Sequence, residues 1–154
     1  MFLLLEQAPA GSRFAFDALC RHIPWNEHGL IAAVAQQHDT GEVLMLAWIN
    51  PTALRETLST GRVCYWSRSR QRLWRKGETS GHVQRLIEAR LDCDGDALLL
   101  RVDQHGAACH TGRRSCFYNR IDGGSVEVMG DAASGPPPSL QAPACEVSLW
   151  EVPS

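Results

Sequence analysis

The sequence predicts a single α+β domain with a mainly antiparallel sheet and short inserted helices. The length of 154 residues fits one domain, strand-like runs alternate with turn signals, and the helical signals are short and separate. The composition is that of an ordinary globular protein, with 44% hydrophobic and 21% charged residues and a formal net charge of −2. This charge balance gives no general reason to expect nucleic acid or an anionic membrane as a partner.

The first two predicted strands form a hairpin, which a helix follows. The apolar runs LIAAVAQQ (30–37) and EVLMLAWI (42–49) are joined by the turn signal DTG. Asn50 is a suitable N-cap and Pro51 suits the first helical position, so a helix is expected to begin there and to end at Gly61.

The rest of the domain is expected to be strands. Residues 62–66, RVCYW, are typical of a strand, and residues 82–92 should pair with residues 97–104 through the turn CDGD. The stretch 12–25 is expected to hold a short helix. From Ile121 the chain contains no Lys or Arg and is rich in Gly, Pro, Ala and Ser. We therefore expect a domain over 1–120 and a mostly disordered tail over 121–154.

The cellular location is expected to be cytoplasmic. No apolar run approaches the roughly 20 residues of a membrane-spanning helix, and the opening MFLLLEQ lacks the basic segment of a signal peptide. Cysteines should then stay reduced. Clustered reduced cysteines are better candidates for metal binding than for disulfides.

The segment DCDGD, residues 92–96, places three carboxylates at alternate positions. An EF-hand loop would need glycine at its sixth position and glutamate at its twelfth, where this chain has Ala97 and Asp103. Calcium is excluded on this ground, and two interpretations stay open: a solvated turn, or a magnesium site that retains several waters. If the segment is extended, its aspartates share one face and Cys93 points to the other.

Cys93, Cys109 and Cys116 are candidate zinc ligands. Their spacing contains no C-x-x-C pair, and three inert buried thiols are the alternative. Three ligands would leave one tetrahedral position open, as in a catalytic site. In a straight helix Cys109 and Cys116 would lie about 10.5 Å apart along the axis, so their segment must fold back, and Thr111–Gly112 is the expected place. Cys93 on the opposite face of its turn could serve a neighbouring subunit, which makes an interface zinc site our hypothesis.

A basic run with interleaved aromatic residues spans residues 62–76, which hold five arginines, one lysine and no acid. Such a run can hold phosphates and stack a base, although an ordinary cationic surface or a weak nucleic-acid patch is equally compatible with it. KGETSG follows and offers hydroxyls and backbone amides to a phosphate, but it is too short for a P-loop. Glu78 is a candidate acid or base there, and His110 beside Cys109 is the candidate general base.

Together these segments resemble the phosphoribosyl-AMP cyclohydrolase family of histidine biosynthesis. The matching runs cover about residues 25–118 in the family's order: WNEHGLIAAVAQQHDTGEVLMLAWIN, TLSTGRVCYWSRSRQRLWRKGETSG, DCDGDALLLRVDQ and ACHTGRRSCF. The resemblance implies hydrolytic opening of the adenine ring of N1-(5-phosphoribosyl)-AMP at the N1–C6 bond, by an intertwined homodimer. The tail is too short and irregular for the helical pyrophosphohydrolase domain fused to some members, so one activity is expected.

The resemblance also implies metals and site residues. Zinc, one ion per subunit, would be bound by Cys93, Cys109 and Cys116, drawn from both chains, and magnesium by Asp92, Asp94 and Asp96. Zinc lowers the pKa of water, and His110, with Glu78 as a second candidate, would move the protons. The two phosphates and the base of the substrate suit the following side chains: Trp66, Ser67, Arg68, Ser69, Arg70, Trp74, Lys76, Thr79 and Ser80.

Other classes of protein fit the sequence less well. A zinc nucleobase deaminase would need H-x-E and P-C-x-x-C, and neither motif occurs. A non-catalytic zinc-binding nucleic-acid module would account for the cysteines and arginines but not for DCDGD. A thiol redox protein would want a close cysteine pair, which the sequence lacks.

Overall fold

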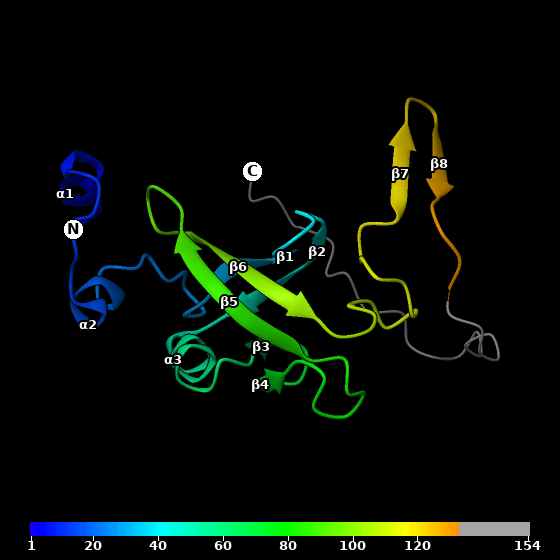
Figure 1. Cartoon of the computed structure of the whole chain (residues 1–154), viewed down its shortest axis with the longest axis horizontal. Helices are drawn as coiled ribbons and strands as arrows, with labels where there is room; N and C mark the ends of the chain where they lie inside the picture. The colour runs from blue at the N-terminus through cyan, green and yellow to red at the C-terminus, as the bar shows by residue number, and fades with distance from the viewer. Residues whose placement is uncertain (133–154) are drawn as a thin grey trace.

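The computed structural model describes residues 1–132 and confirms the α+β class. Six strands form one sheet in the order β4-β3-β2-β1-β6-β5 (Figure 1). β1 and β6 run parallel, and the other neighbouring strands run antiparallel. The strands are β1 (Ile31–Gln37), β2 (Val43–Ile49), β3 (Cys64–Ser67), β4 (Arg72–Arg75), β5 (Gln84–Leu91) and β6 (Ala97–Gln104).

Both expected hairpins are present. β1 pairs with β2 from Ile31 opposite Ile49 to Ala35 opposite Met45, and every second residue of β1 is buried. β5 pairs with β6 across the acidic turn. The period-two burial of β1 and β6 places one face of these strands on the core.

The helix after β2 is confirmed as α3 (Pro51–Thr60). The Asn50 side chain accepts a hydrogen bond of 2.8 Å from the backbone N–H of Ala53, which makes Asn50 the N-cap. Gly61 ends the helix with φ of 71°, a left-handed conformation that favours glycine. Leu54 and Thr57 on α3 are buried against the sheet.

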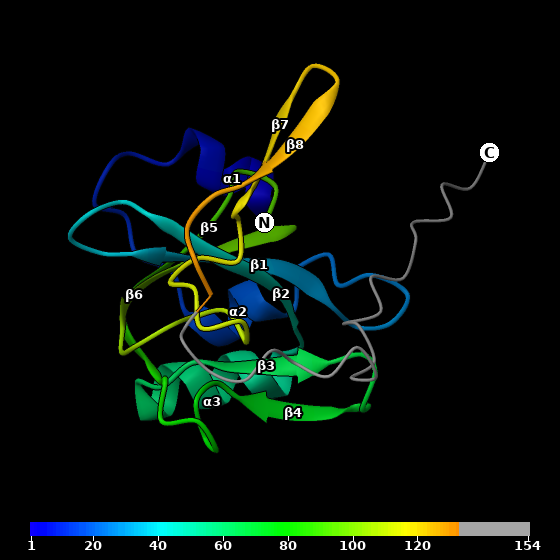
Figure 2. The same ribbon diagram turned by 90° about the vertical axis from the view of Figure 1, so that its right-hand side faces the viewer.

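The sheet curls until its two sides meet. The N–H of Val63 donates to the carbonyl of Gln84 (3.0 Å), and the N–H of Leu86 donates to the carbonyl of Gly61 (2.8 Å). β5 thereby reaches the segment that leads into β3. Figure 2 shows the result, with β1, β2 and β5 above and β3 and β4 below. The hydrophobic core fills the curl and includes Ile31, Ala33, Ala35, Leu44, Met45, Ile49, Tyr65, Leu98, Leu100 and Val102.

The two ends of the curled sheet differ. α1 (Phe2–Gln7) and α2 (Phe16–Cys20) lie at one end, and the segment after β6 lies at the other (Figure 1). α2 lies within the stretch where a short helix was expected, and Cys20 buries its side chain in the core. α1 was not predicted. It packs on the acidic turn so closely that a Cβ at Gly95 would come 2.1 Å from the ring of Phe2.

A second sheet includes the first residues of the segment 121–154, which was expected to be mostly disordered. β7 (Asn119–Asp122) and β8 (Ser125–Val128) form a fully exposed hairpin that projects from the domain (Figure 2). The Gly-Gly turn between alternating apolar and polar residues is a local hairpin signal that the Gly-rich composition of the segment obscured. Residues 133–154, with Leu149 and Trp150, lie outside the described residues.

No helix within residues 1–132 is both long enough and apolar enough to span a lipid bilayer.

Candidate metal centres and active site

The acidic turn brings its three carboxylates together. The ligand oxygens of Asp92, Asp94 and Asp96 lie within 4.8 Å of one another, and the three side chains are exposed. The segment is a turn and not the extended chain that the alternation argument assumed. The Asp92 carboxylate accepts hydrogen bonds from the N–H groups of Gly95 (2.9 Å) and Ala97 (3.3 Å). The turn therefore gathers the carboxylates by wrapping around Asp92.

Mutual repulsion sets the protonation of this group. Hydrogen bonding to Asp94 and then to Asp92 raises the pKa of Asp96 to about 6, because carboxylates this close cannot all stay ionised. Slight burial opposes ionisation of Asp92, but hydrogen bonds from Asp96, Ala97 and Gly95 outweigh it and lower the pKa of Asp92. A divalent cation would relieve this repulsion, and three carboxylate oxygens are suitable ligands for a hard ion such as magnesium.

The segment with Cys109 and Cys116 folds back as predicted. The N–H of Ala108 donates to the carbonyl of Arg114 (3.0 Å), and the N–H of Cys109 donates to the carbonyl of Arg113 (3.1 Å). The reversal includes Thr111 and Gly112, and the Thr111 hydroxyl donates to the Cys109 sulfur at 3.1 Å. Cys116 is fixed to β2, because its N–H donates to the carbonyl of Leu44 (2.7 Å). Residues 105–118, here called the cysteine loop, thus hold two thiols at one end of the sheet.

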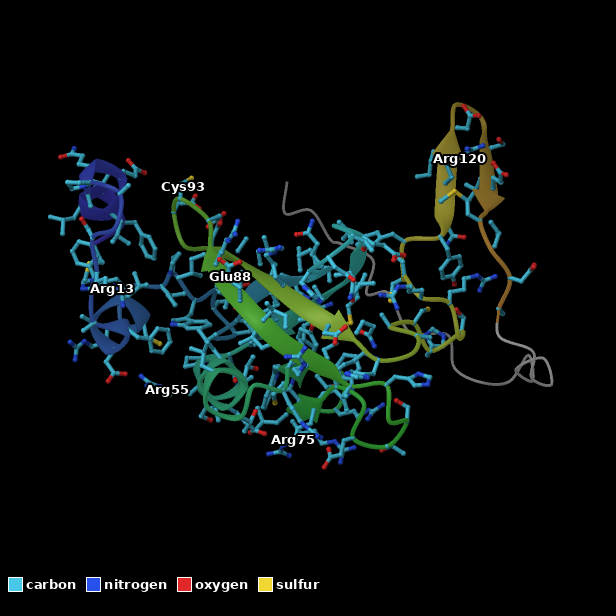
Figure 3. All side chains as sticks on the ribbon, in the orientation of Figure 1. Arg13, Arg55, Arg75, Glu88, Cys93 and Arg120 are labelled. Carbon is cyan, nitrogen blue, oxygen red and sulfur yellow. The ribbon has the colours of Figure 1, made fainter. Side chains whose placement is uncertain are left out.

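Cys93 lies at the other end of the sheet. Figure 3 shows it at the turn between β5 and β6, opposite the end from which the cysteine loop departs. The eight residues of β6, at about 3.3 Å each, separate the two ends by more than about 20 Å. Within residues 1–132, the three aspartates are the only group of three or more His, Cys, Asp or Glu ligand atoms within 4.8 Å of one another. A single chain therefore does not bring its three candidate zinc ligands together.

The KGETSG loop, residues 76–81, packs beside the cysteine loop. Its chain is tightly closed: a Cβ at Gly77 would lie 2.4 Å from backbone atoms of His82 and Val83. The imidazole of His82 in turn packs on Gly106, where a Cβ would come 2.6 Å from its Cδ2. Two segments that are separate in the sequence therefore meet at the same end of the sheet.

A buried polar chain supports both loops from within the core. The Tyr65 hydroxyl donates to Gln84 (2.7 Å), and the Gln84 amide donates to the side-chain oxygen of Gln104 (2.8 Å). The Gln104 amide then donates to the carbonyls of His105 (3.0 Å) and His82 (3.3 Å). Burial raises the pKa of Tyr65, which keeps its hydroxyl protonated as a donor. The sequence analysis missed this chain, because nothing in a lone Gln or Tyr within a strand signals a buried partner.

Seven of the nine predicted substrate residues fall into two groups at opposite ends of the β3–β4 hairpin. Ser67, Arg68, Ser69 and Arg70 lie at its turn, where the hydroxyls of Ser67 and Ser69 are 3.4 Å apart. Lys76, Thr79 and Ser80 lie beyond the other end of β4, and Trp66 and Trp74 lie within the strands. Thr79 and Ser80 are exposed, whereas Lys76 is buried.

Trp48 is an aromatic residue at the first group that the sequence analysis did not single out. It lies opposite Trp66 in the pairing of β2 with β3, and the Arg68 guanidinium lies 5.0 Å from its ring centre. The sequence placed Trp48 on a predicted strand. It did not predict the strand register that places Trp48 opposite Trp66.

The two predicted catalytic residues lie on the two loops. His110 is exposed, with its Nδ1 4.0 Å from the Cys109 sulfur. Glu78 is exposed, and its backbone N–H donates to the carbonyl of Arg75 at 3.1 Å.

Cys64 can be set apart from the candidate ligands. Its side chain is buried in the core, and that burial raises the pKa of its thiol to about 11. It therefore stays a neutral thiol at physiological pH. The donor sets that fit metals are the oxygens of the acidic turn for a hard cation and the sulfurs of Cys93, Cys109 and Cys116 for zinc.

Comparison with known proteins agrees with these motifs. A family model described as phosphoribosyl-AMP cyclohydrolase matches residues 45–118. Phosphoribosyl-AMP cyclohydrolase 2 of Pseudomonas fluorescens is 70% identical over 81% of this chain and 85% of its own length. The phosphoribosyl-AMP cyclohydrolase of Alkalilimnicola ehrlichii is 67% identical over 84% of this chain and 91% of its own length. That of Granulibacter bethesdensis is 75% identical over 64% and 77%. The chain therefore belongs to the phosphoribosyl-AMP cyclohydrolase family and is a hydrolase.

Proposed function

We propose that the protein hydrolyses N1-(5-phosphoribosyl)-AMP in histidine biosynthesis and opens the adenine ring at the N1–C6 bond in a zinc-dependent reaction. The observation that carries this proposal is the meeting of the KGETSG loop and the cysteine loop at one end of the sheet. One loop carries two thiols and an imidazole and the other carries several hydroxyls, and the Gln104 amide of the buried chain links them by donating to the carbonyls of His105 and His82. This arrangement combines ligands for a soft metal, a group that can move protons and groups that can hold an anion.

The zinc site is proposed to be shared between two copies of the chain. Cys109 and Cys116 of one copy would bind the ion together with Cys93 of the partner subunit. The separation of Cys93 from the cysteine loop along β6 supports this arrangement, because the three sulfurs of one chain lie too far apart for one ion. A zinc ion bound there supplies Lewis acidity, which makes water a competent nucleophile at neutral pH.

His110 is proposed to move the protons. Its Nδ1 faces the Cys109 sulfur, so Nε2 is the atom left to accept a proton from the attacking water. Water adds to C6, the N1–C6 bond breaks, and the proton returns to N1, so that no other reactant is needed. Glu78 on the neighbouring loop is the second candidate for this transfer.

The substrate phosphates are proposed to occupy two separate places. The turn with Arg68 and Arg70 offers guanidinium groups, and Thr79 with Ser80 offers hydroxyls and backbone amides. The four-residue β4 spaces these groups by about 10–13 Å. That spacing suits a nucleotide that carries a phosphate on each of two riboses. Magnesium is proposed to bind the acidic turn through Asp92, Asp94 and Asp96.

The test is turnover of phosphoribosyl-AMP by metal-stripped protein, with zinc and magnesium restored separately. We expect no ring opening without metal, recovery with zinc, and little recovery with magnesium alone. Ring opening is measured by the change in ultraviolet absorbance between the substrate and the ring-opened product. Activity unaffected by chelation would contradict the zinc-dependent mechanism.

The same assay separates the metal from the proton transfer. A zinc-loaded His110→Ala variant should lose about 10²- to 10⁴-fold in kcat, as is typical when general acid–base catalysis is removed. Near-normal kcat in that variant, with zinc content unchanged, would exclude His110 from this role and leave Glu78.

A further inference from the structure

Lys76 occupies an unusual position for a basic residue. It is the only lysine among the 15 Lys and Arg residues of the sequence. Its side chain is 8% exposed, although lysine is rarely buried without a partner charge. Burying an ammonium group without a compensating charge costs free energy. A negative charge is therefore expected near Lys76.

Within the described part of the chain, no carboxylate forms an ion pair with Lys76. The ion pairs among residues 1–132 all involve arginine or histidine. The ammonium nitrogen lies 5.7 Å from the ring centre of Trp74, which provides a weaker, cation–π contact. Burial lowers the pKa of Lys76, and the thiols of Cys116 and Cys109 act against that shift. The residues that favour the charged form of Lys76 are thus the two candidate zinc ligands of the cysteine loop, Cys116 and Cys109.

The packing of the two loops explains this proximity. Lys76 begins the KGETSG loop, and its N–H donates to the carbonyl of Val63 at 3.1 Å. The same loop is followed directly by His82, which packs on Gly106 of the cysteine loop. Lys76 is thus held on the core side of the KGETSG loop, whereas Thr79 and Ser80 face solvent.

The charge of a zinc–thiolate centre fits this position. Three thiolates on one divalent ion leave one net negative charge, which a partly buried site must compensate. Lysine suits the role better than arginine, because its ammonium group is a compact point charge on a flexible stem. A phosphate ligand, by contrast, would be expected to present its charge to solvent.

We propose that Lys76 is a positioning residue that supplies the counter-charge of the zinc–thiolate centre and does not bind a substrate phosphate. The inference rests on the zinc site of the proposed function. It replaces the role of substrate ligand that the basic run suggested for this residue.

The test is zinc affinity of the Lys76→Met variant, measured by competition with a chromogenic chelator. Methionine has a similar length and no charge. We expect zinc to bind about 10- to 100-fold more weakly, as for other residues that support metal ligands. The metal-free variant should unfold at the same temperature as the metal-free wild type or higher, because a buried charge has been removed.

Arg72→Met is the matched control, because Arg72 is an exposed basic residue on the adjoining strand β4. It should leave zinc affinity unchanged. Lys76→Gln removes the charge but keeps a polar end, so it provides a second measurement of zinc affinity if the methionine variant does not fold.

Two results would overturn the proposal. Unchanged zinc affinity with a raised KM would make Lys76 a substrate ligand, and a metal-free variant that unfolds at a clearly lower temperature would make its role structural. Failure of the proposed function is a separate outcome. It would appear as zinc-loaded wild type that does not open phosphoribosyl-AMP, whatever the affinity of the variant.

Discussion

Asp96 illustrates how neighbours set the chemistry of a single residue. Its pKa of about 6 results from contact with Asp94 and Asp92, and it exceeds the ~3.9 of an aspartate in an unfolded chain. Its contribution to the stability of the metal-free protein is therefore fully present below about pH 4 and is lost as the pH rises through 6. A cation that binds the three carboxylates must displace the proton that Asp96 holds below that pH.

Magnesium binding should therefore depend on pH. We expect millimolar Mg²⁺ to raise the unfolding temperature at pH 7.5 and to have a much smaller effect at pH 5, because protons compete for Asp96. The measurement is thermal unfolding with and without magnesium at each pH. Asp96→Asn should weaken the magnesium effect at pH 7.5 and reduce its pH dependence. An equal magnesium effect at both pH values in the wild type would contradict this assignment of the acidic turn.

At the scale of elements, the KGETSG loop depends on one glycine. Gly77 has φ of +80°, and an added Cβ would lie 2.4 Å from backbone atoms that cannot move independently of the loop. Gly81 has nearly the same φ, +77°, but an added Cβ there meets nothing within 4 Å. The two glycines share the same conformational requirement and differ only in the space around them.

This difference gives a paired prediction. Gly81→Ala should cost about 1–2 kcal/mol for the left-handed backbone alone. Gly77→Ala should cost an additional ~1–3 kcal/mol for the steric clash, and it should also lower turnover because the loop must shift from the cysteine loop. Chemical denaturation and kcat/KM of both variants measure these effects. Equal destabilisation by the two substitutions would show that the loop is not closed at Gly77.

Local signals explain which elements could be predicted. The β1–β2 and β5–β6 hairpins and α3 each carry their own turn, cap or alternation, and Asn50 and Gly61 define α3 without any tertiary information. β4 lies within the basic run, where the charges obscured the alternation. α1 depends on a tertiary contact, the packing of Phe2 on Gly95, and such contacts leave no periodic trace in the sequence.

At the scale of the whole molecule, the curl of the sheet determines where the residues of the candidate site lie. The fold-back at Thr111 was predictable, because it follows from the spacing of Cys109 and Cys116, which is a local property. The burial of Lys76 and the chain from Tyr65 to Gln104 were not, because they arise where β5 returns to the segment before β3. The same geometry places Cys93 and the cysteine loop at opposite ends of β6, which is why the proposed zinc site takes its three thiols from two copies of the chain.

A shared site predicts that two inactive variants complement each other. Cys93→Ser and Cys109→Ser should each abolish activity alone, because every site in either homodimer lacks a ligand. After the two chains are mixed and allowed to exchange, half of the dimers contain one chain of each kind. One of the two sites in such a dimer has all its cysteines, since its Cys93 and its cysteine loop come from different chains. Activity should then recover to about one quarter of the wild-type value, with zinc content rising in proportion.

Cys93→Ser mixed with the double variant Cys93→Ser/Cys109→Ser is the control and should stay inactive. Exchange confirmed by mass spectrometry without any recovery would place all three sulfurs of each site in one chain.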